Sequence, residues 1–356
     1  LLALFSGIAS MSAAAPFASV TVATTMPAAI LAGGAVVAGI IAASSRFPMR
    51  PAIAAVASLS ALVWLPALPA PMPGRIELHM LDVGQGDAVL VRTDRGNWIL
   101  FDAGPAWATG DAGRNVITPY VQHRGGTLQT FVLSHPHTDH VGGAASVLRS
   151  LHPRDYWDAA FAGGSLAYIA SLRSAKSEGV AWHRVHPGSD LHVDGVSVRF
   201  LAPDSSWTVS LHDPNLASTI AVVSYGSVRF LLVGDAEKPE EDWLLAHSRE
   251  ELHADILKVG HHGSATSTSD AFLAAVQPRA ALISVGAHNL YHHPSPDIIR
   301  ALRLAGAEVL RTDELGTIVA TTDGRTIEMQ AHGEKWELHA GSSTRSPDVR
   351  SPSPRN

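Results

Sequence analysis

The sequence predicts an α/β fold in which two β-sheets are sandwiched between helices and preceded by transmembrane helices. Three observations support this prediction. From Pro71 to about His339, short β-rich runs alternate, singly and in pairs, with helical stretches. No charged residue precedes Arg46, and none lies between Arg50 and Arg75. Histidines and aspartates stand just beyond several apolar strands, where loops hold ligands and catalytic groups.

Two apolar segments, Pro27–Ser45 and Pro51–Ala70, are long enough to span a bilayer. Leu1–Val20 is also apolar and is interpreted as the end of another span or a re-entrant piece. Arg46 and Arg50 lie in the short connection, which the positive-inside rule places in the cytoplasm, so the chain beyond the second segment is expected outside the membrane. The alternative is a pair of buried core helices.

The chain is therefore divided into three regions. Residues 1–70 are expected to end a longer multi-pass membrane region, residues 71–340 to form a folded domain, and residues 341–356 to be a disordered tail. The absence of cysteine excludes disulfides and thiolate metal ligands.

The charge of the chain is a poor match for tight binding of nucleic acid. The net charge is −6 and there is no basic run, whereas affinity for DNA comes largely from neutralising its phosphates. The scattered cations form a basic patch only if the fold gathers them; they are Arg92, Arg95, Arg114, Arg124 and Lys258.

The first half of the folded domain is expected to begin with a hairpin around the glycine-punctuated turn VGQGD. A third strand, a helix and a buried strand follow it. These elements, in order, are the strands Arg75–Asp82, Ala88–Thr93 and Asn97–Gly104, the helix Gly113–Gly125 and the strand Leu128–Ser134.

The second half repeats strands and helices, with polar loops after the strands. A helix at Lys238–Ser248 carries acids in its first turn, where the helix dipole favours them. A helix at Ser295–Ala307 has Asp near its start and Gly near its end. The expected strands are Val196–Pro203, Ser218–Gly226, Val228–Glu237, Ala254–Ser264 and Ala280–Asn289.

The motif H-x-H-x-D-H, formed by His135, His137, Asp139 and His140, follows the buried strand directly. Residues two apart in an extended segment point the same way, so His135 and His137 are expected to bind one ion. After a turn, Asp139 and His140 are expected to face a second ion. Packing or surface roles are the alternative, but four ligand-type residues within six positions favour metal.

Two neighbouring ions need a shared ligand, and Asp235 is the candidate, because a carboxylate can bridge. The alternative is that Asp235 caps the next helix. His261 and His262 offer the remaining imidazole; in an extended turn they face opposite ways, so His262 is expected to ligate and His261 to support it or pack. Imidazole suits zinc, iron and manganese, and two divalent ions, Mn or Zn, are expected.

Further residues are expected around the ions. Asp102 and Asp87 are interpreted as groups that orient the ligating imidazoles. Asp139 and His293 are candidate catalytic residues, and Asn289 is expected to orient His293. Capping of the loop before the following proline is the alternative for His293 and Asn289.

In order along the chain, FDAG, SHPHTDHVGG, VGDAE and HHGS resemble the metallo-β-lactamase superfamily. LDVGQGDAVLV, ILKVGHHGSATSTS and NLYHHPSPDIIRAL look like the C-terminal domain of the ComEC family of competence proteins. This resemblance covers most of Ile76 to about Thr322. It implies an αββα sandwich on the outer side of the inner membrane, beside a DNA-conducting channel and possible further DNA-uptake proteins.

The chain departs from the wider superfamily at one ligand. The superfamily's histidine after H-x-H-x-D-H is missing from LHDPNLAST, and the branch pattern N-x-x-S falls on Asn215 and Ser218. Either residue is therefore expected to approach the ion or a bound water, and His212 is a weaker candidate. The first ion site is expected to be weaker, harder or partly occupied.

The resulting functional hypothesis is metal-dependent hydrolysis of the phosphodiester bonds of incoming DNA. One alternative is a non-catalytic module that guides DNA, which the intact ligand set argues against. Another is a hydrolase of a different phosphodiester or of a lactam. The missing histidine and the membrane tether argue against a lactamase.

Overall fold

The computed structural model describes residues 26–64, 71–161, 165–210 and 213–338. The apolar segment expected at 1–20, the end of the second apolar segment at 65–70, His212 and the tail expected at 341–356 lie outside these described residues.

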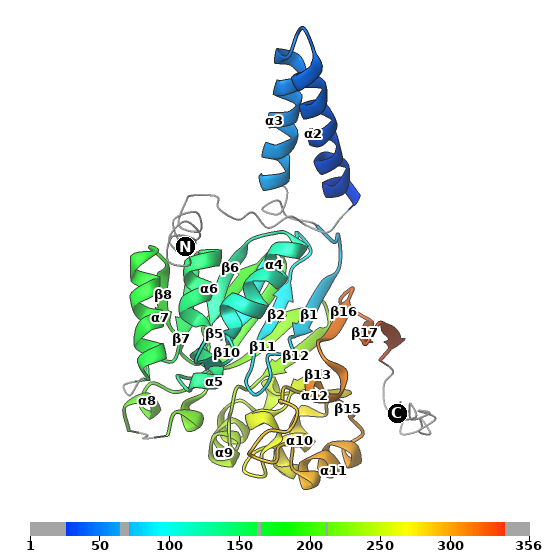
Figure 1. Cartoon of the computed structure of the whole chain (residues 1–356). Coiled ribbons are helices and arrows are strands. Elements are labelled where there is room, and N and C mark those ends of the chain that lie inside the picture. Colours follow the sequence, from blue (N-terminus) through cyan, green and yellow to red (C-terminus); the bar gives the residue numbers. More distant parts are fainter. Residues whose placement is uncertain (1–25, 65–70, 162–164, 211–212, 339–356) are drawn as a thin grey trace.

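The two N-terminal apolar segments form helices α2 (Met26–Ser44) and α3 (Met49–Trp64), which make a hairpin (Figure 1). Large apolar side chains on both helices, such as Val36, Ile40 and Val56, are exposed, which argues against the alternative of buried core helices. Among the residues that the structure describes, no helix is both long and apolar enough to cross a membrane.

The folded domain contains a nine-stranded sheet, here called the first sheet, with the order β18-β17-β16-β1-β2-β3-β6-β7-β8. β1 and β2 are antiparallel, as expected for the hairpin around VGQGD, whereas β3, β6, β7 and β8 run parallel. The strands are β1 (Ile76–Met80), β2 (Val89–Arg92), β3 (Trp98–Phe101), β6 (Leu128–Val132), β7 (Asp155–Asp158), β8 (Ala181–Arg184), β16 (Ile318–Thr322), β17 (Ile327–Ala331) and β18 (Glu334–Glu337).

The second sheet has seven strands in the order β15-β14-β13-β12-β11-β10-β9. Its strands β12 to β15 are parallel. They are β9 (Asp190–Val193), β10 (Val196–Ala202), β11 (Ile220–Tyr225), β12 (Val228–Leu232), β13 (Ile256–Lys258), β14 (Ala280–Ile283) and β15 (Glu308–Arg311). A separate two-strand ribbon joins β4 (Ala106–Trp107) to β5 (Gly110–Asp111).

Helices cover the outer face of each sheet (Figure 1). The first sheet is covered by α4 (Thr118–Arg124), α6 (Ala144–Leu151) and α7 (Leu166–Ser177), and the second by α9 (Lys238–His247), α10 (Asp270–Val276) and α11 (Pro296–Leu304). Shorter helices are α5 (Thr138–Val141), α8 (Trp207–Ser210) and α12 (Thr312–Leu315). There is a π-helical turn at Gly113–Ile117, and there are 3₁₀ turns at Pro214–Ala217, Arg249–Glu251 and Gly260–Gly263.

The core between the sheets follows from the alternation of side chains along each strand. Val91 and Ile99 of the first sheet meet Phe200 and Phe230 of the second, whereas Leu90 points out to the helices. Strands buried on both faces read as continuous apolar runs, which explains why β2 and β3 do not alternate in sequence. The expected layering of two sheets between helices is confirmed.

This topology collects the ligand-type residues at one edge of the sandwich. Asp102 follows β3 and His135 follows β6 of the first sheet, while Asp235 follows β12 and His262 follows β13 of the second. The carboxyl ends of parallel neighbours lie at the same edge, so segments far apart in sequence converge there.

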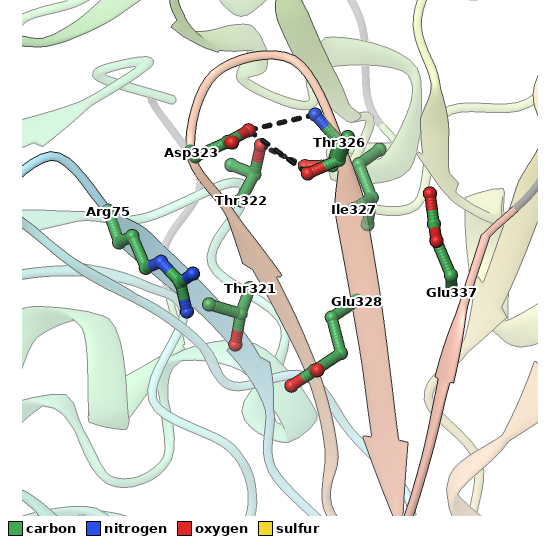
Figure 2. A pocket seen from close by; sticks show the side chains of 8 residues that line it. All are labelled: Arg75, Thr321, Thr322, Asp323, Thr326, Ile327, Glu328 and Glu337. Atoms are coloured by element: carbon green, nitrogen blue, oxygen red, sulfur yellow. Dashed lines mark hydrogen bonds between the residues drawn. The ribbon is translucent and has the colours of Figure 1, made fainter.

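A shallow surface hollow lies at the other end of the first sheet, on the β16–β17 hairpin (Figure 2). Thr322 in this hairpin pairs with Ile76, the first residue of β1. The ligand-type residues lie at the opposite end of the sheet, beyond the last residue of β1. The Asp323 carboxylate closes the hairpin by accepting hydrogen bonds from the backbone N–H and the hydroxyl of Thr326, at 2.9 and 3.1 Å. The hollow is therefore separate from the ligand cluster.

The first turn of α9 contains acids, as the sequence predicts. Glu240 and Glu241 are both buried. The carboxylate of Glu241 accepts hydrogen bonds from the backbone N–H groups of Thr268 and Ser269, where α10 begins. The acid thus satisfies unpaired donors of a neighbouring helix, which a reading of its own helix alone does not predict.

Glu240 provides a test of this packing by pH. Burial raises the pKa of its carboxyl group well above the ordinary value. The folded state therefore holds the proton more tightly than the unfolded state. The stability from this proton is full below the unfolded pKa of about 4.3 and is lost as the pH rises towards the folded pKa.

We expect Glu240→Gln to match the wild type in free energy of unfolding near pH 4 and to exceed it at pH 8, as measured by urea denaturation. Parallel pH profiles of the two proteins would contradict a protonated Glu240.

Candidate metal centre

The first pair of histidines lies on the segment between β6 and α5. His137 is extended, with φ −70° and ψ 149°, and α5 begins at the next residue, Thr138. His135 Nε2 and His137 Nδ1 are 3.0 Å apart, so the two rings present nitrogens to the same point. This placement follows from the two-residue period of an extended chain.

A second group of ligand atoms comes from both sheets. The Asp139, His140, Asp235 and His262 ligand atoms all lie within 4.8 Å of one another. His262 Nε2 is 3.3 Å from Asp139 Oδ2, and His140 Nε2 is 3.2 Å from Asp235 Oδ2. One carboxylate and one imidazole from each side of the sandwich thus surround one position.

Asp235 lies between the two groups. Its Oδ2 is 3.2 Å from His140 Nε2 and 4.0 Å from His135 Nε2, so one oxygen faces both. The alternative role as a helix cap does not match the structure, because Glu237 holds the N-cap position of α9. The preceding Gly234 has φ +53°, and a Cβ there would lie 2.7 Å from the Cβ of Ser134, so glycine allows the two loops to touch.

The Gly-His-His-Gly turn corrects the expectation that His261 and His262 face opposite ways. Both residues adopt the left-handed conformation, with φ of 46° and 52°. Their Nε2 atoms therefore both approach Asp235 Oδ2, at 3.8 and 3.6 Å. The extended turn assumed from the sequence was wrong, since left-handed residues rotate successive side chains far less than an extended chain does.

Each imidazole of this turn is fixed through its other nitrogen. His261 Nδ1 is 2.9 Å from Glu237 Oε1, and His262 Nδ1 is 2.8 Å from the carbonyl oxygen of Ser284. His262 is enclosed, whereas the side chain of His261 is 24% exposed. His261 therefore stands at the opening of the cluster.

Asp102 and Asp87 lie behind the ligand-type histidines. Asp102 Oδ2 is 2.8 Å from His140 Nδ1, and the N–H and hydroxyl of Ser134 each donate a hydrogen bond to Asp102 at 2.7 Å. Asp87 Oδ1 is 3.4 Å from His262 Nδ1. Such acceptors fix the tautomer and the direction of the rings.

Lys258, at the end of β13, was missed as a residue of the cluster. Its side chain is buried, contacts the Asp87 carboxylate, and lies 3.6 Å from Asp235 Oδ1. Burial opposes the charge, but the Asp87 and Asp235 carboxylates raise the pKa of Lys258. The signal in the sequence was a lysine closing an apolar strand just before Gly-His-His.

The five scattered cations are not gathered into one patch, because Lys258 is interior. Arg92 and Arg124 are neighbours, and Arg92 Nη2 donates a hydrogen bond to the carbonyl oxygen of Arg124 at 3.0 Å. Arg92 lies 3.7 Å from Glu77, and the exposed Arg95 lies 3.8 Å from Asp194. These cations therefore do not form one positively charged surface that would attract phosphate groups.

Asn289 serves its own loop, whereas Ser218 contacts the segment that carries Asp235. Asn289 donates to the carbonyl oxygens of Gly286 and His293, at 3.1 and 2.7 Å, and accepts from the His293 N–H at 2.9 Å, which is the loop-capping alternative. Ser218 Oγ accepts a hydrogen bond from the Asp235 N–H at 3.2 Å. Asn215 Oδ1 is buried without a hydrogen-bond partner among the described residues.

The cluster fits a divalent cation. His140 and His262 each engage an acceptor through Nδ1, which leaves Nε2 directed towards the Asp235 carboxylate. An imidazole nitrogen that faces a carboxylate oxygen needs positive charge between the two atoms. Burial opposes charge on both rings, but the surrounding carboxylates raise the pKa of His140 well above its ordinary value and that of His262 to about 10. A proton therefore occupies each place without metal, and a divalent ion would replace it.

The charge of the cluster agrees with this fit. Burial would raise the pKa of Asp87, but Lys258, His262 and His140 lower it to about 2, so its carboxyl group is ionised. The four acids of the two candidate groups are Asp87, Asp102, Asp139 and Asp235. Lys258 offsets one of these negative charges, and two divalent cations would bring the sum close to neutrality.

We expect manganese or zinc to raise the thermal unfolding midpoint of chelator-treated protein, because a ligand that binds only the folded state stabilises it, by about 2.7 kcal/mol at 100 times its dissociation constant. Asp235→Asn should abolish most of the response, and the surface variant Asp190→Asn should keep it. Differential scanning fluorimetry measures the midpoint. An equal rise in all three proteins on addition of metal would argue against this site.

Lys258→Met should destabilise the chelator-treated protein by roughly 3–5 kcal/mol, because two buried carboxylates lose their cation. Added manganese should recover part of this loss, since it supplies positive charge to the same carboxylates. Urea denaturation with and without metal measures both effects, and an unchanged midpoint would show that Lys258 does not balance the cluster.

Comparison with known proteins places this geometry in a family. Residues 81–288 match the family model of the metallo-β-lactamase superfamily. The chain is 31% identical over 262 residues to ComE operon protein 3 of Bacillus subtilis, and the match covers 68% of this chain and 32% of that protein.

Two further relatives are Recombination protein 2 of Haemophilus influenzae and Competence protein ComA of Neisseria gonorrhoeae. Both are 32% identical, over 73% and 67% of this chain and over 30% and 31% of their own lengths. The chain thus spans about a third of the curated relatives that it matches. The chain belongs to the metallo-β-lactamase superfamily, in its branch of ComEC-type competence proteins.

Proposed function

We propose that this chain is a metal-dependent hydrolase that cleaves the phosphodiester bonds of DNA during DNA uptake. The observation that carries the proposal is the convergence of two groups of ligand atoms on Asp235 Oδ2. A bridging carboxylate between two imidazole groups is the arrangement that two-metal phosphoesterases use. The competence names of the relatives support DNA as the substrate.

The cluster is enclosed except on one side, where two of its side chains are partly exposed. The Asp139 side chain is 34% exposed and that of His261 is 24% exposed, whereas His135, His140 and His262 are enclosed. A phosphodiester therefore approaches past Asp139 and His261. This narrow access suits a phosphate group on a flexible strand better than a bulky ring system.

Bound divalent ions would supply charge for the phosphate oxygens and lower the pKa of water. The protein's own groups complete the site. Asp139, the most exposed carboxylate of the cluster, stays ionised, because His140 and His262 hold its pKa well below the usual range despite burial. It accepts a hydrogen bond that orients the attacking water. His261, with Nδ1 held by Glu237, directs Nε2 towards the phosphate, and His293, whose ring centroid is 5.8 Å from that of His261, donates a hydrogen bond to the leaving oxygen.

The dispersed cations argue against a non-catalytic module that guides DNA. Such a module depends on neutralising phosphates, and in this chain Lys258 is interior while Arg92 is paired with Glu77. A catalytic site needs less affinity of its own when the substrate is delivered to it. The exposed apolar side chains of α2 and α3, with Arg46 and Arg50 at their connection, support a tether at the inner membrane and a folded domain on its outer side.

The test is cleavage of labelled single- and double-stranded DNA by the whole chain, in mild detergent, with added manganese, magnesium or zinc. Metal-dependent cleavage is expected, and Asp235→Asn should lower its rate at least 100-fold, because the variant loses the charge shared by both groups of ligand atoms. Asp190→Asn should cleave as the wild type does. A folded protein that binds metal but cleaves neither substrate would overturn the proposal.

A further inference from the structure

An exposed aromatic ring stands beside the metal cluster on the segment between β14 and α11, here called the 286–294 loop. Tyr291 is 67% exposed and its neighbour Leu290 is 91% exposed. The ring of Tyr291 stacks on that of His293, with centroids 5.8 Å apart and planes at 16°. Contact between apolar surface and water is unfavourable, so a ligand that covers these side chains gains free energy of binding.

The loop holds this ring in a fixed place. Asn289 joins its two ends by bonding to Gly286 and His293. Gln85 Oε1, from the VGQGD turn, accepts the Gly286 N–H at 3.2 Å, and the Ser295 N–H donates to Gly263 O at 2.8 Å. The loop is therefore attached on both sides to the turns that surround the cluster, and a fixed ring binds with less loss of entropy.

Successive ring contacts also connect Tyr291 with the reaction site. The ring centroids of His293 and His261 are 5.8 Å apart, and His261 Nε2 is 3.8 Å from Asp235 Oδ2. Tyr291, His293 and His261 thus form a series of neighbouring rings that begins at solvent and ends at the bridging carboxylate.

We propose that Tyr291 is a stacking platform for an unpaired nucleobase next to the phosphodiester at the metal cluster, which makes single-stranded nucleic acid the substrate class. This inference rests on the proposed function. One face of the tyrosine ring is covered by His293, and the exposed area leaves the other available. In the interior of a duplex both faces of each base are stacked, so there only an unpaired base can lie on this ring.

The test compares binding of a phosphorothioate-linked single strand, which resists cleavage, by fluorescence anisotropy in the presence of manganese. Tyr291→Ala should raise the dissociation constant about tenfold, since base stacking on an aromatic ring has this magnitude. Tyr291→Phe should bind within about twofold of the wild type, because the stacking face is kept. Leu290→Ala is the matched control for loss of exposed apolar surface on the same loop and should also bind as the wild type does.

A second comparison removes bases from the DNA strand instead of the ring from the protein. On a strand with abasic sites at every second position, wild type and Tyr291→Ala should differ much less than on the intact strand. Equal binding of the intact strand by wild type and Tyr291→Ala would overturn the platform, as would the same tenfold loss on both strands, which would mean contact with the backbone. If the wild-type protein neither binds nor cleaves DNA, the proposed function is overturned, and this inference with it.

Discussion

The structure depends on one constraint: the carboxylates of Asp87, Asp102, Asp139 and Asp235 are gathered between the two sheets, and all of them except Asp139 are buried. Like charges at such distances repel strongly when water is excluded. Lys258 offsets part of this charge from inside the sandwich, and the unpaired Nε2 atoms of His140 and His262 leave positions for metal ions to offset the rest. The cluster is therefore stable only as a charged assembly that includes cations.

This constraint explains why the backbone turns are so tight. The Gly86 residue of VGQGD has φ +142°, and a Cβ there would lie 2.3 Å from the carbonyl oxygen of Asp139. Gly234 allows a similar approach between the loops of the two sheets. Both positions let strand ends from different parts of the chain come close enough for their side chains to share one ion site.

The same loops link the cluster to the surface that a substrate meets. The Gly-His-His-Gly turn supplies His262 to the interior and His261 to the opening, and its Gly263 backbone holds the loop that carries His293 and Tyr291. Chemistry and substrate contact are thus attached to one short stretch of backbone. A change in that stretch affects both.

Local patterns in the sequence predict the sandwich, because strand and helix periods are local. They also predict the ligand-type residues at strand ends, because H-x-H-x-D-H and Asp235 directly follow apolar runs. How those residues are used depends on the folded arrangement of the chain. The left-handed conformation of His261 and His262 and the burial of Lys258 depend on contacts between distant strands. Local patterns carry no information about such contacts, because the partner of a buried charge is chosen by the packing of the whole domain.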